Sequence, residues 1–216
     1  MTESIICFGA GINSTAMTLL LYEQGNHLPI VFADTGCEWP ETYAFIDLFE
    51  EYLLRQWNME IIKVQSERGN MYDWFWKEKK IPFVRARMCT RIWKLEPIVK
   101  NFPTAKVHFV GIGADEAHRA RREFKRYKVV RKFPLIEAGV KREDCKKIIE
   151  RHGLPVPPRS NCFICPFQSL ERYRELALKH PDLFTKATVL EERAGRWLKY
   201  HAPLRELIPE FFLQRS

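Results

Sequence analysis

The chain has 216 residues, of which 46% are hydrophobic, and it carries a formal net charge of +8. This length and composition indicate a compact globular protein, and the positive charge favours acidic partners such as nucleotides or nucleic acids. No run of about 18 apolar residues and no signal-peptide pattern is present, which argues against membrane spans and secretion, so we expect a cytoplasmic protein without a membrane partner.

The first element is an apolar run at residues 5–8, which predicts a strand. Small residues follow it, and an amphipathic helix is expected to run to residue 24. Backbone N–H groups in such a loop can approach an anion closely, and the start of the helix adds unsatisfied donors and a positive dipole end. We therefore predict that a nucleotide phosphate is bound by Gly9, Ala10, Gly11, Ile12, Asn13, Ser14 and Thr15. No Walker A or dinucleotide G-x-G-x-x-G pattern fits, because no Gly-Lys follows and Ser14 replaces the third glycine.

A second strand is predicted at residues 28–33 and ends in the polar loop Asp34-Thr35-Gly36, before a helix at 41–56. This order is a βα unit, so the sheet should be parallel. Further strands are expected at 59–64, 106–111 and 129–134, and further helices at 71–80, 94–100, 142–152, 171–179 and 184–197. We expect an α/β fold with a parallel five-stranded sheet flanked by helices. The proline-rich breaker at 153–158 predicts a nucleotide-binding domain over residues 1–153 and a helical tail over 154–216, packed on the first domain.

Six cysteines without a signal peptide indicate metal or redox chemistry. Cys162 and Cys165 form a Cys-x-x-Cys pair in a loop within the tail. A thioredoxin-like redox pair would need a strand-to-helix junction early in its fold, so a metal site is favoured. Candidates for further thiolate ligands are Cys89, Cys145, Cys37 and Cys7, of which Cys7 is set aside because it lies in a predicted buried strand.

Four segments together resemble the PP-loop ATP pyrophosphatase and phosphoadenosine-phosphosulfate reductase superfamily. Residues 9–14 resemble its Ser-Gly-Gly-x-Asp-Ser loop, and residues 34–42 resemble Asp-Thr-Gly-x-x-x-Pro-Glu-Thr. Cys89-Thr90 with Lys94 and Pro97 resembles a third motif, and residues 111–116 resemble Gly-x-Arg-x-Asp-Glu. The chain departs from these patterns at Asn13, which replaces Asp, and at Gly113, which replaces Arg.

The resemblance implies an adenine nucleotide alpha hydrolase-like fold that binds ATP with Mg²⁺ and releases pyrophosphate. It implies catalytic roles for Asp34, Lys94, Asp115 and Arg122, and nucleotide contacts from Asp34, Thr35, Gly36, Gly111 and Glu116. Asn13 cannot be an anionic metal ligand, so Mg²⁺ should rest on Asp34, Asp115 or Glu116, or on the triphosphate.

The branch that the chain resembles most is the sulfurtransferases of DNA phosphorothioation, where four cysteines are taken to hold a 4Fe-4S cluster. The equivalents are Cys89, Cys145, Cys162 and Cys165, with a three-cysteine cluster as the variant if Cys145 is not a ligand. Zinc remains the alternative metal, because four thiolates bind it as readily. Cys37 could receive a persulfide or be a passive loop residue.

The function expected from this resemblance is activation of a nucleic acid, DNA in preference to tRNA, for sulfur insertion within a multi-protein complex supplied by a cysteine desulfurase. A basic run at residues 118–132 agrees with such an acceptor, although charge runs often only face water. Three alternatives stay open: a tRNA-thiolating enzyme, a reductase of phosphoadenosine or adenosine phosphosulfate, and a catalytically silent nucleotide-binding subunit. No cysteine follows Cys165, whereas the reductases use a cysteine in a C-terminal Glu-Cys-Gly-x-His segment.

Overall fold

The computed structural model describes residues 2–85, 87–121, 127–199 and 201–208, and the chain divides into two compact units. The first unit contains residues 1–33, 40–64 and 95–160, and the second contains residues 34–39, 65–94 and 161–216. We expected one boundary after residue 153. The second unit also takes in two segments that leave the strands of the first, so the sequence changes unit several times.

The first unit is built on a five-stranded sheet with strand order β3-β2-β1-β4-β5. The strands are β1 (Ser4–Phe8), β2 (Ile30–Asp34), β3 (Ile61–Gln65), β4 (Val107–Val110) and β5 (Val130–Lys132). β1 lies at the centre and pairs in parallel with both β2 and β4, with Cys7 opposite Val31 on one side and Val110 on the other. The predicted α/β fold with a parallel five-stranded sheet is confirmed.

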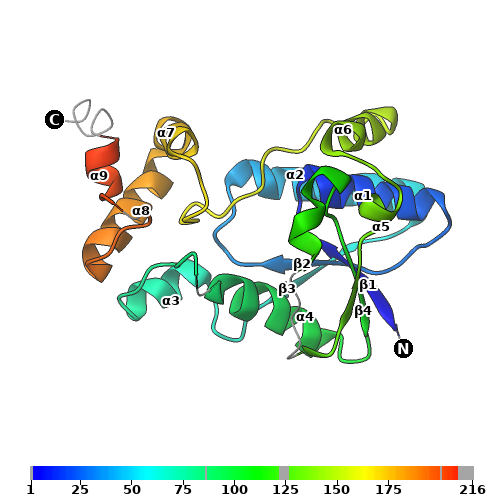
Figure 1. The fold of residues 1–216 in the computed structure, drawn as a ribbon, viewed down its shortest axis with the longest axis horizontal. Helices are drawn as coiled ribbons and strands as arrows, with labels where there is room; N and C mark the ends of the chain where they lie inside the picture. The colour runs from blue at the N-terminus through cyan, green and yellow to red at the C-terminus, as the bar shows by residue number, and fades with distance from the viewer. Residues whose placement is uncertain (1, 86, 122–126, 200, 209–216) are drawn as a thin grey trace. The chain divides into compact units, whose positions relative to one another are not determined.

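Helices cover both faces of this sheet, as Figure 1 shows. Side chains of β1 alternate between the faces, so that Ile6 and Phe8 enter one core while Ile5 enters another. The first core is completed by α1 (Ile12–Glu23), α2 (Pro40–Trp57) and α6 (Arg142–Arg151), and the second by α4 (Glu96–Asn101). A 3₁₀ segment, η2 (Ala114–Arg121), and the short α5 (Pro134–Glu137) complete the described part of this unit.

The second unit is helical and has its own apolar core. It contains α3 (Met71–Lys77), the π-helical turn η1 (Thr90–Leu95), α7 (Leu170–Lys179), α8 (Pro181–Ala194) and α9 (Leu204–Leu207). Its core is rich in aromatic residues, among them Trp39, Phe75, Trp93, Tyr173 and Phe184, all fully buried or nearly so. On the helix predicted at 71–80, Phe75 is buried, whereas its neighbours Trp74 and Trp76 are half-buried.

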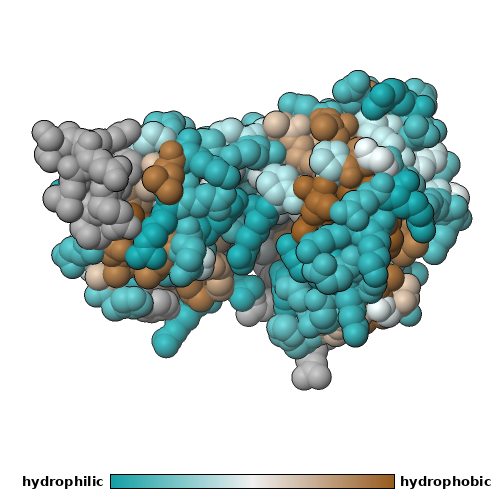
Figure 2. All heavy atoms as spheres, turned by 90° about the horizontal axis from the view of Figure 1, so that it is seen from above, coloured by the Kyte–Doolittle hydropathy of each residue, from teal (hydrophilic) through white to brown (hydrophobic). Residues whose placement is uncertain are grey.

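Most of the surface in view is hydrophilic, with hydrophobic side chains reaching it in limited patches (Figure 2). Among the described residues, no helix is long and apolar enough to cross a membrane. The large apolar side chains that remain exposed include Phe83, Phe167 and Trp197 in the second unit.

Candidate functional site

The first candidate site lies at the point in the sheet of the first unit where the order of the strands reverses. β1 is followed along the chain by β2 and β3 on one side of the sheet, whereas β4 and β5 lie on its other side, so the switch point lies between β1 and β4. Ligands of parallel α/β sheets bind in the crevice at such a switch point, beyond the carboxyl ends of the strands. The two loops are residues 9–11 and 111–113, both within the predicted nucleotide site.

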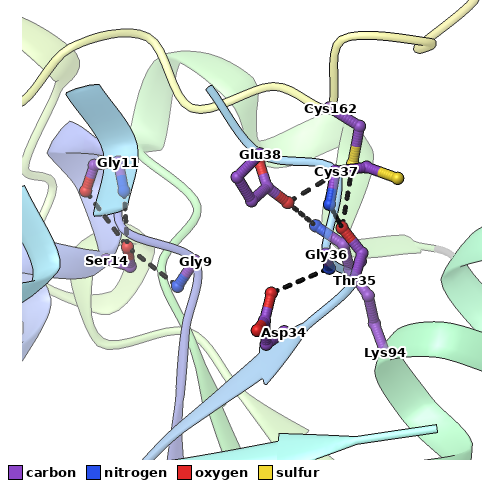
Figure 3. Close-up of polar contacts among 10 residues, drawn as sticks. All are labelled: Gly9, Gly11, Ser14, Asp34, Thr35, Gly36, Cys37, Glu38, Lys94 and Cys162. Atoms are coloured by element: carbon purple, nitrogen blue, oxygen red, sulfur yellow. Dashed lines mark hydrogen bonds and ion pairs between the residues drawn. The ribbon is translucent and has the colours of Figure 1, made fainter. Parts of the chain in front are cut away.

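The loop after β1 is organised by the hydroxyl group of Ser14. Its Oγ accepts hydrogen bonds from the N–H groups of Gly9 and Gly11, each at 3.2 Å, and donates one to the Gly11 carbonyl at 3.0 Å (Figure 3). Two backbone donors thus converge on one oxygen at the start of α1. This is the donor arrangement that an anionic oxygen of a phosphate requires.

The other residues of the loop hold its backbone in this conformation. Ala10 is fully buried and has a positive φ of 52°, a left-handed conformation that glycine adopts more easily. Ile12 packs into the core, and the buried Thr15 donates its hydroxyl proton to the Gly11 carbonyl at 3.0 Å. The structure therefore places Ile12 and Thr15 in the scaffold of the loop, and the ligand-facing donors are those of Gly9 and Gly11.

Gly111, at the end of β4, touches the loop directly. A Cβ atom at this position would lie 2.7 Å from both N and Cα of Ser14, which are backbone atoms that cannot move aside. Only glycine therefore lets β4 and the start of α1 approach this closely. The same contact brings the predicted residues Gly111 and Ser14 together.

Asn13, which stands where the family motif has aspartate, makes a side-chain hydrogen bond. Asn13 is 7% exposed, and its Nδ2 donates a hydrogen bond to Glu116 Oε2 at 3.1 Å, while Arg119 pairs with the other oxygen at 2.8 Å. Asn13 Oδ1 is buried without a hydrogen-bond partner in the described structure. Asp115 Oδ1 accepts the N–H of Arg142, where α6 begins. Asn13 and Glu116 are thus brought together, whereas Asp115 supports a neighbouring helix.

In the second unit, the loop that starts at Asp34 is tightly hydrogen-bonded. Asp34 Oδ1 accepts the N–H of Gly36 at 2.8 Å, and Thr35 Oγ1 accepts that of Cys37 at 3.2 Å. Gly36 has a φ of 69°, which favours glycine, and a Cβ there would lie 2.2 Å from Asn70 Nδ2, so a larger residue would displace the Asn70 side chain. Asn70 donates to the Gly36 carbonyl and caps α3 with its Oδ1.

The second candidate site is a polar cluster formed by the buried Glu38 and the partly exposed Lys94 and Cys162 (Figure 3). The Glu38 side chain is only 3% exposed, and its Oε1 lies 3.3 Å from both Lys94 Nζ and Cys162 Sγ. Thr35 Oγ1 lies 3.5 Å from the same sulfur. The Glu38 carboxylate raises the pKa of Lys94, with smaller contributions from Cys162 and Cys89, so the ammonium group stays protonated.

Cys89 and Cys165 belong to the same electrostatic environment. Burial raises the pKa of the Cys162 and Cys165 thiols, while the Lys94 ammonium lowers both; Cys89 raises that of Cys165. The loop that carries the pair is held by hydrogen bonds to its carbonyl groups, including one from Tyr173 Oη to Cys165 at 3.0 Å. Three of the four cysteines predicted as ligands therefore interact electrostatically with Lys94, and Cys89 also interacts with Cys165.

The donor set Cys89, Cys162 and Cys165 suits a thiophilic metal centre by its chemistry. In the described structure, no three His, Cys, Asp or Glu side chains stand close enough together to form a metal site as they are. Metal binding there requires the thiols to turn toward one centre and lose their protons, and Lys94 supplies positive charge beside them.

The remaining predicted residues are placed as follows. Cys145 lies in the first unit, fully buried in the core on α6, and burial raises the pKa of its thiol to about 11. Cys37 is also fully buried, and burial raises the pKa of its thiol as well, which is unfavourable for a nucleophile. Arg122 lies outside the described residues.

Sequence reasoning missed Glu38 and Asn70. Glu38 was one of three variable positions between Gly36 and Pro40, and nothing in its local sequence predicts burial beside a thiol. A signal for Asn70 was present, since an Asn directly before a helix is a typical N-cap.

A parallel α/β sheet with a small-residue loop at its switch point is typical of proteins of the PP-loop type. The phosphoadenosine phosphosulfate reductase domain family matches residues 3–158. The chain belongs to this family. The sequence-based assignment to the PP-loop and reductase superfamily is thereby confirmed.

Two uncharacterized proteins of Methanocaldococcus jannaschii are similar in sequence. One is 28% identical over 90% of this chain and 44% of its own length, and the other is 23% identical over 93% and 53%. The chain thus spans about half the length of the curated relatives it matches.

Two solved structures share the fold. The phosphoadenylyl-sulfate reductase of Candida auris in a phosphate complex is similar with a TM-score of 0.54 and 14% identity, over 73% of this chain and 76% of that one. The U34-tRNA thiolase NcsA of Methanococcus maripaludis with its [4Fe-4S] cluster has a TM-score of 0.53 and 16% identity, over 93% and 75%. The fold is therefore one on which both reductases and thiolases are built.

Proposed function

We propose that this protein is an adenylating sulfurtransferase that acts on a nucleic acid. The observation that carries the proposal is the group of three thiols, Cys89, Cys162 and Cys165, around the Lys94–Glu38 pair. The [4Fe-4S] cluster of the thiolase NcsA, a protein of the same fold, supports an iron–sulfur centre in preference to zinc.

In the first step, the loop at residues 9–14 would bind the phosphates of ATP. An oxygen of the acceptor attacks the α-phosphorus, the bond from that phosphorus to the bridging oxygen breaks, and pyrophosphate leaves with that oxygen. The N–H groups of Gly9 and Gly11 would then donate to phosphate oxygens in place of Ser14 Oγ. A sulfur nucleophile afterwards displaces AMP, which leaves with the acceptor oxygen.

Charge compensation in this step is divided between protein and metal. Asn13 is neutral and Glu116 is already paired with Arg119, so we propose that Mg²⁺ is held mainly by the triphosphate itself. Arg122 and Asp34 remain proposed catalytic residues on the strength of the family motifs.

Cys89, Cys162 and Cys165 would hold the iron–sulfur centre. When bound, such a centre would hold or relay the sulfur atom. The residues of the chain would provide thiolate ligands, and the Lys94 ammonium would offset part of their negative charge. Cys145 is the less suitable fourth ligand because its thiol is fully buried in the apolar core of the first unit.

The acceptor and partners follow from charge and family only. A net charge of +8 suits a polyanion, and a cysteine desulfurase within a larger complex would supply the sulfur. Among acceptors we expected the DNA backbone, and tRNA is the acceptor of the thiolase NcsA. DNA and RNA must therefore be tested separately as acceptors.

The metal proposal is tested by iron and sulfide analysis of anaerobically purified protein. We expect iron and acid-labile sulfide in the wild type and loss of both in Cys162→Ala, because removal of one of three thiolates should release the centre. Cys7→Ala is the matched control, since Cys7 lies in β1 of the other unit, and it should keep its iron. Zinc in the wild type would change the metal but keep the site. Absence of any metal, or iron retained in Cys162→Ala, would contradict it.

A further inference from the structure

The segment that carries Cys89 is unusually basic. Residues 81–95 contain four basic side chains and no acidic one, and three of these, Arg85, Arg87 and Arg91, are exposed. Lys94, the fourth, belongs to the cysteine cluster. A short exposed run of arginines beside a reactive centre is typical of a surface that binds phosphate groups.

An exposed aromatic ring lies directly beyond the other two cysteines. Phe167 follows Cys165 by two residues and is 51% exposed. The guanidinium carbon of Arg87 lies 4.9 Å from the centre of its ring. Arg87 in turn precedes Cys89 by two residues, so this ring and this guanidinium join the two segments that carry the three cysteines.

Arg87 also has an unusual backbone. Its φ is 42°, in the left-handed region that residues other than glycine seldom adopt. Such conformations occur mainly in turns and at functional sites. Phe83, at the start of the same segment, is 44% exposed, and within the described residues the exposed aromatic side chains all lie in the second unit.

We propose that Phe167 and Arg87 form a stacking platform for one unpaired base of the nucleic-acid acceptor, and that Arg85 and Arg91 bind its flanking phosphates. This inference rests on the proposed function and names the form of its substrate. An aromatic face binds a base of any sequence by stacking, and an arginine beside it can add a cation–π contact. A base in a duplex has both faces covered, so the platform requires a single-stranded or splayed-out nucleotide.

The test is fluorescence anisotropy with a short fluorescein-labelled oligonucleotide of mixed sequence, used as single-stranded DNA, as single-stranded RNA and as a DNA duplex. Phe167→Ala should weaken binding of a single strand about tenfold, within the range known for one stacked base, and leave duplex binding nearly unchanged. Phe167→Trp, which keeps an aromatic face, should bind the single strand as tightly as the wild type. Arg85→Ala should weaken binding of single strands of any sequence and reduce the slope of log affinity against log salt by about one, because it removes a phosphate contact.

Leu178→Ala is the matched control, because Leu178 is 78% exposed on α7 and has no part in the platform. Its affinity should equal that of the wild type. The platform is wrong if the wild type binds a single strand and Phe167→Ala binds equally well, or if single strand and duplex lose affinity equally. If the wild type binds no nucleic acid, the acceptor proposed above fails as well, whereas its iron content and ATP chemistry stand on their own measurements.

Discussion

Gly111 shows at the scale of one residue how the sheet fixes the nucleotide loop. Gly111→Ala would place a methyl group against the backbone of Ser14, where nothing can yield. We expect a loss of roughly 1–3 kcal/mol in the free energy of unfolding and a strong loss of ATP affinity. Urea unfolding and calorimetric titration with ATP measure the two effects.

Gly9→Ala, in the loop after β1, is the matched control for stability. A Cβ at Gly9 would meet Ser14 Oγ at 3.9 Å, an ordinary contact, so this variant should keep nearly full stability. Equal losses in the two variants would show that glycine is needed for chain flexibility and not for close approach.

Asn13 marks the limit of what motifs predict at this scale. The sequence alone shows that residue 13 is a neutral amide, which cannot supply the negative charge of an aspartate. The hydrogen bond from Asn13 to Glu116, 103 residues away, could not be predicted, because it depends on the pairing of β1 with β4. Glu38 was missed for the same reason, since its partners Lys94 and Cys162 come from distant segments.

At the scale of elements, α8 is joined to the segment after it by a buried carboxylate. Glu191 is 1% exposed, and its two oxygens accept the N–H groups of Leu198 and Leu204 at 2.7 and 2.8 Å. Burial raises the pKa of this carboxyl group from 4.5 to about 7, although the two hydrogen bonds lower it. The group is therefore protonated in the folded protein over a pH range in which it is ionised in the unfolded chain.

Because its pKa is raised in the folded state, Glu191 makes the protein less stable as the pH rises. Between about pH 4.5 and pH 7 the folded state binds one more proton, so its contribution to stability is fully present below the unfolded pKa and is lost as the pH rises through about 7. The loss is on the order of 3 kcal/mol for the second unit. Glu191→Gln cannot ionise and should remove this part of the pH dependence.

Urea unfolding followed by tryptophan fluorescence at several pH values measures the effect. The signal reports mainly on the second unit, which holds five of the six tryptophans, Trp39, Trp74, Trp76, Trp93 and Trp197. Glu206→Gln, at an exposed position of the same unit, is the control and should keep the slope of the wild type. An unchanged slope in Glu191→Gln would assign the pH dependence to other groups.

Most helices and strands could be predicted because their signals are local. Short runs of apolar residues predicted the central strands to within a few residues, and the βα order predicted a parallel sheet. The helix expected at 184–197 ends earlier, at Ala194, because Gly195 adopts a left-handed C-cap with a φ of 60°. The π-helical turn at 90–95 and the 3₁₀ segment at 114–121 have no periodic signal and were not predicted.

At the scale of the molecule, the nucleotide site stays a prediction from motifs, and the two compact units differ from the division predicted after residue 153. Residues 9–14 and 111–116 were assigned to one site from motifs, and the switch point between β1 and β4 brings these loops together. The proline-rich segment at 153–158 signalled a change of unit in that region. The segments 34–39 and 65–94 carry no comparable signal, because they leave the sheet through ordinary loops.

The central claim, that this protein adenylates a nucleic acid, is tested most directly by product analysis of α-labelled ATP with Mg²⁺. The reaction is run with single-stranded DNA, with tRNA and without acceptor, under anaerobic conditions. We expect acceptor-dependent release of pyrophosphate, with the label in AMP or on the nucleic acid, and no labelled ADP. Formation of ADP, or bound ATP that yields no pyrophosphate with either acceptor, would contradict the claim and leave a protein that binds nucleotide without activating a substrate.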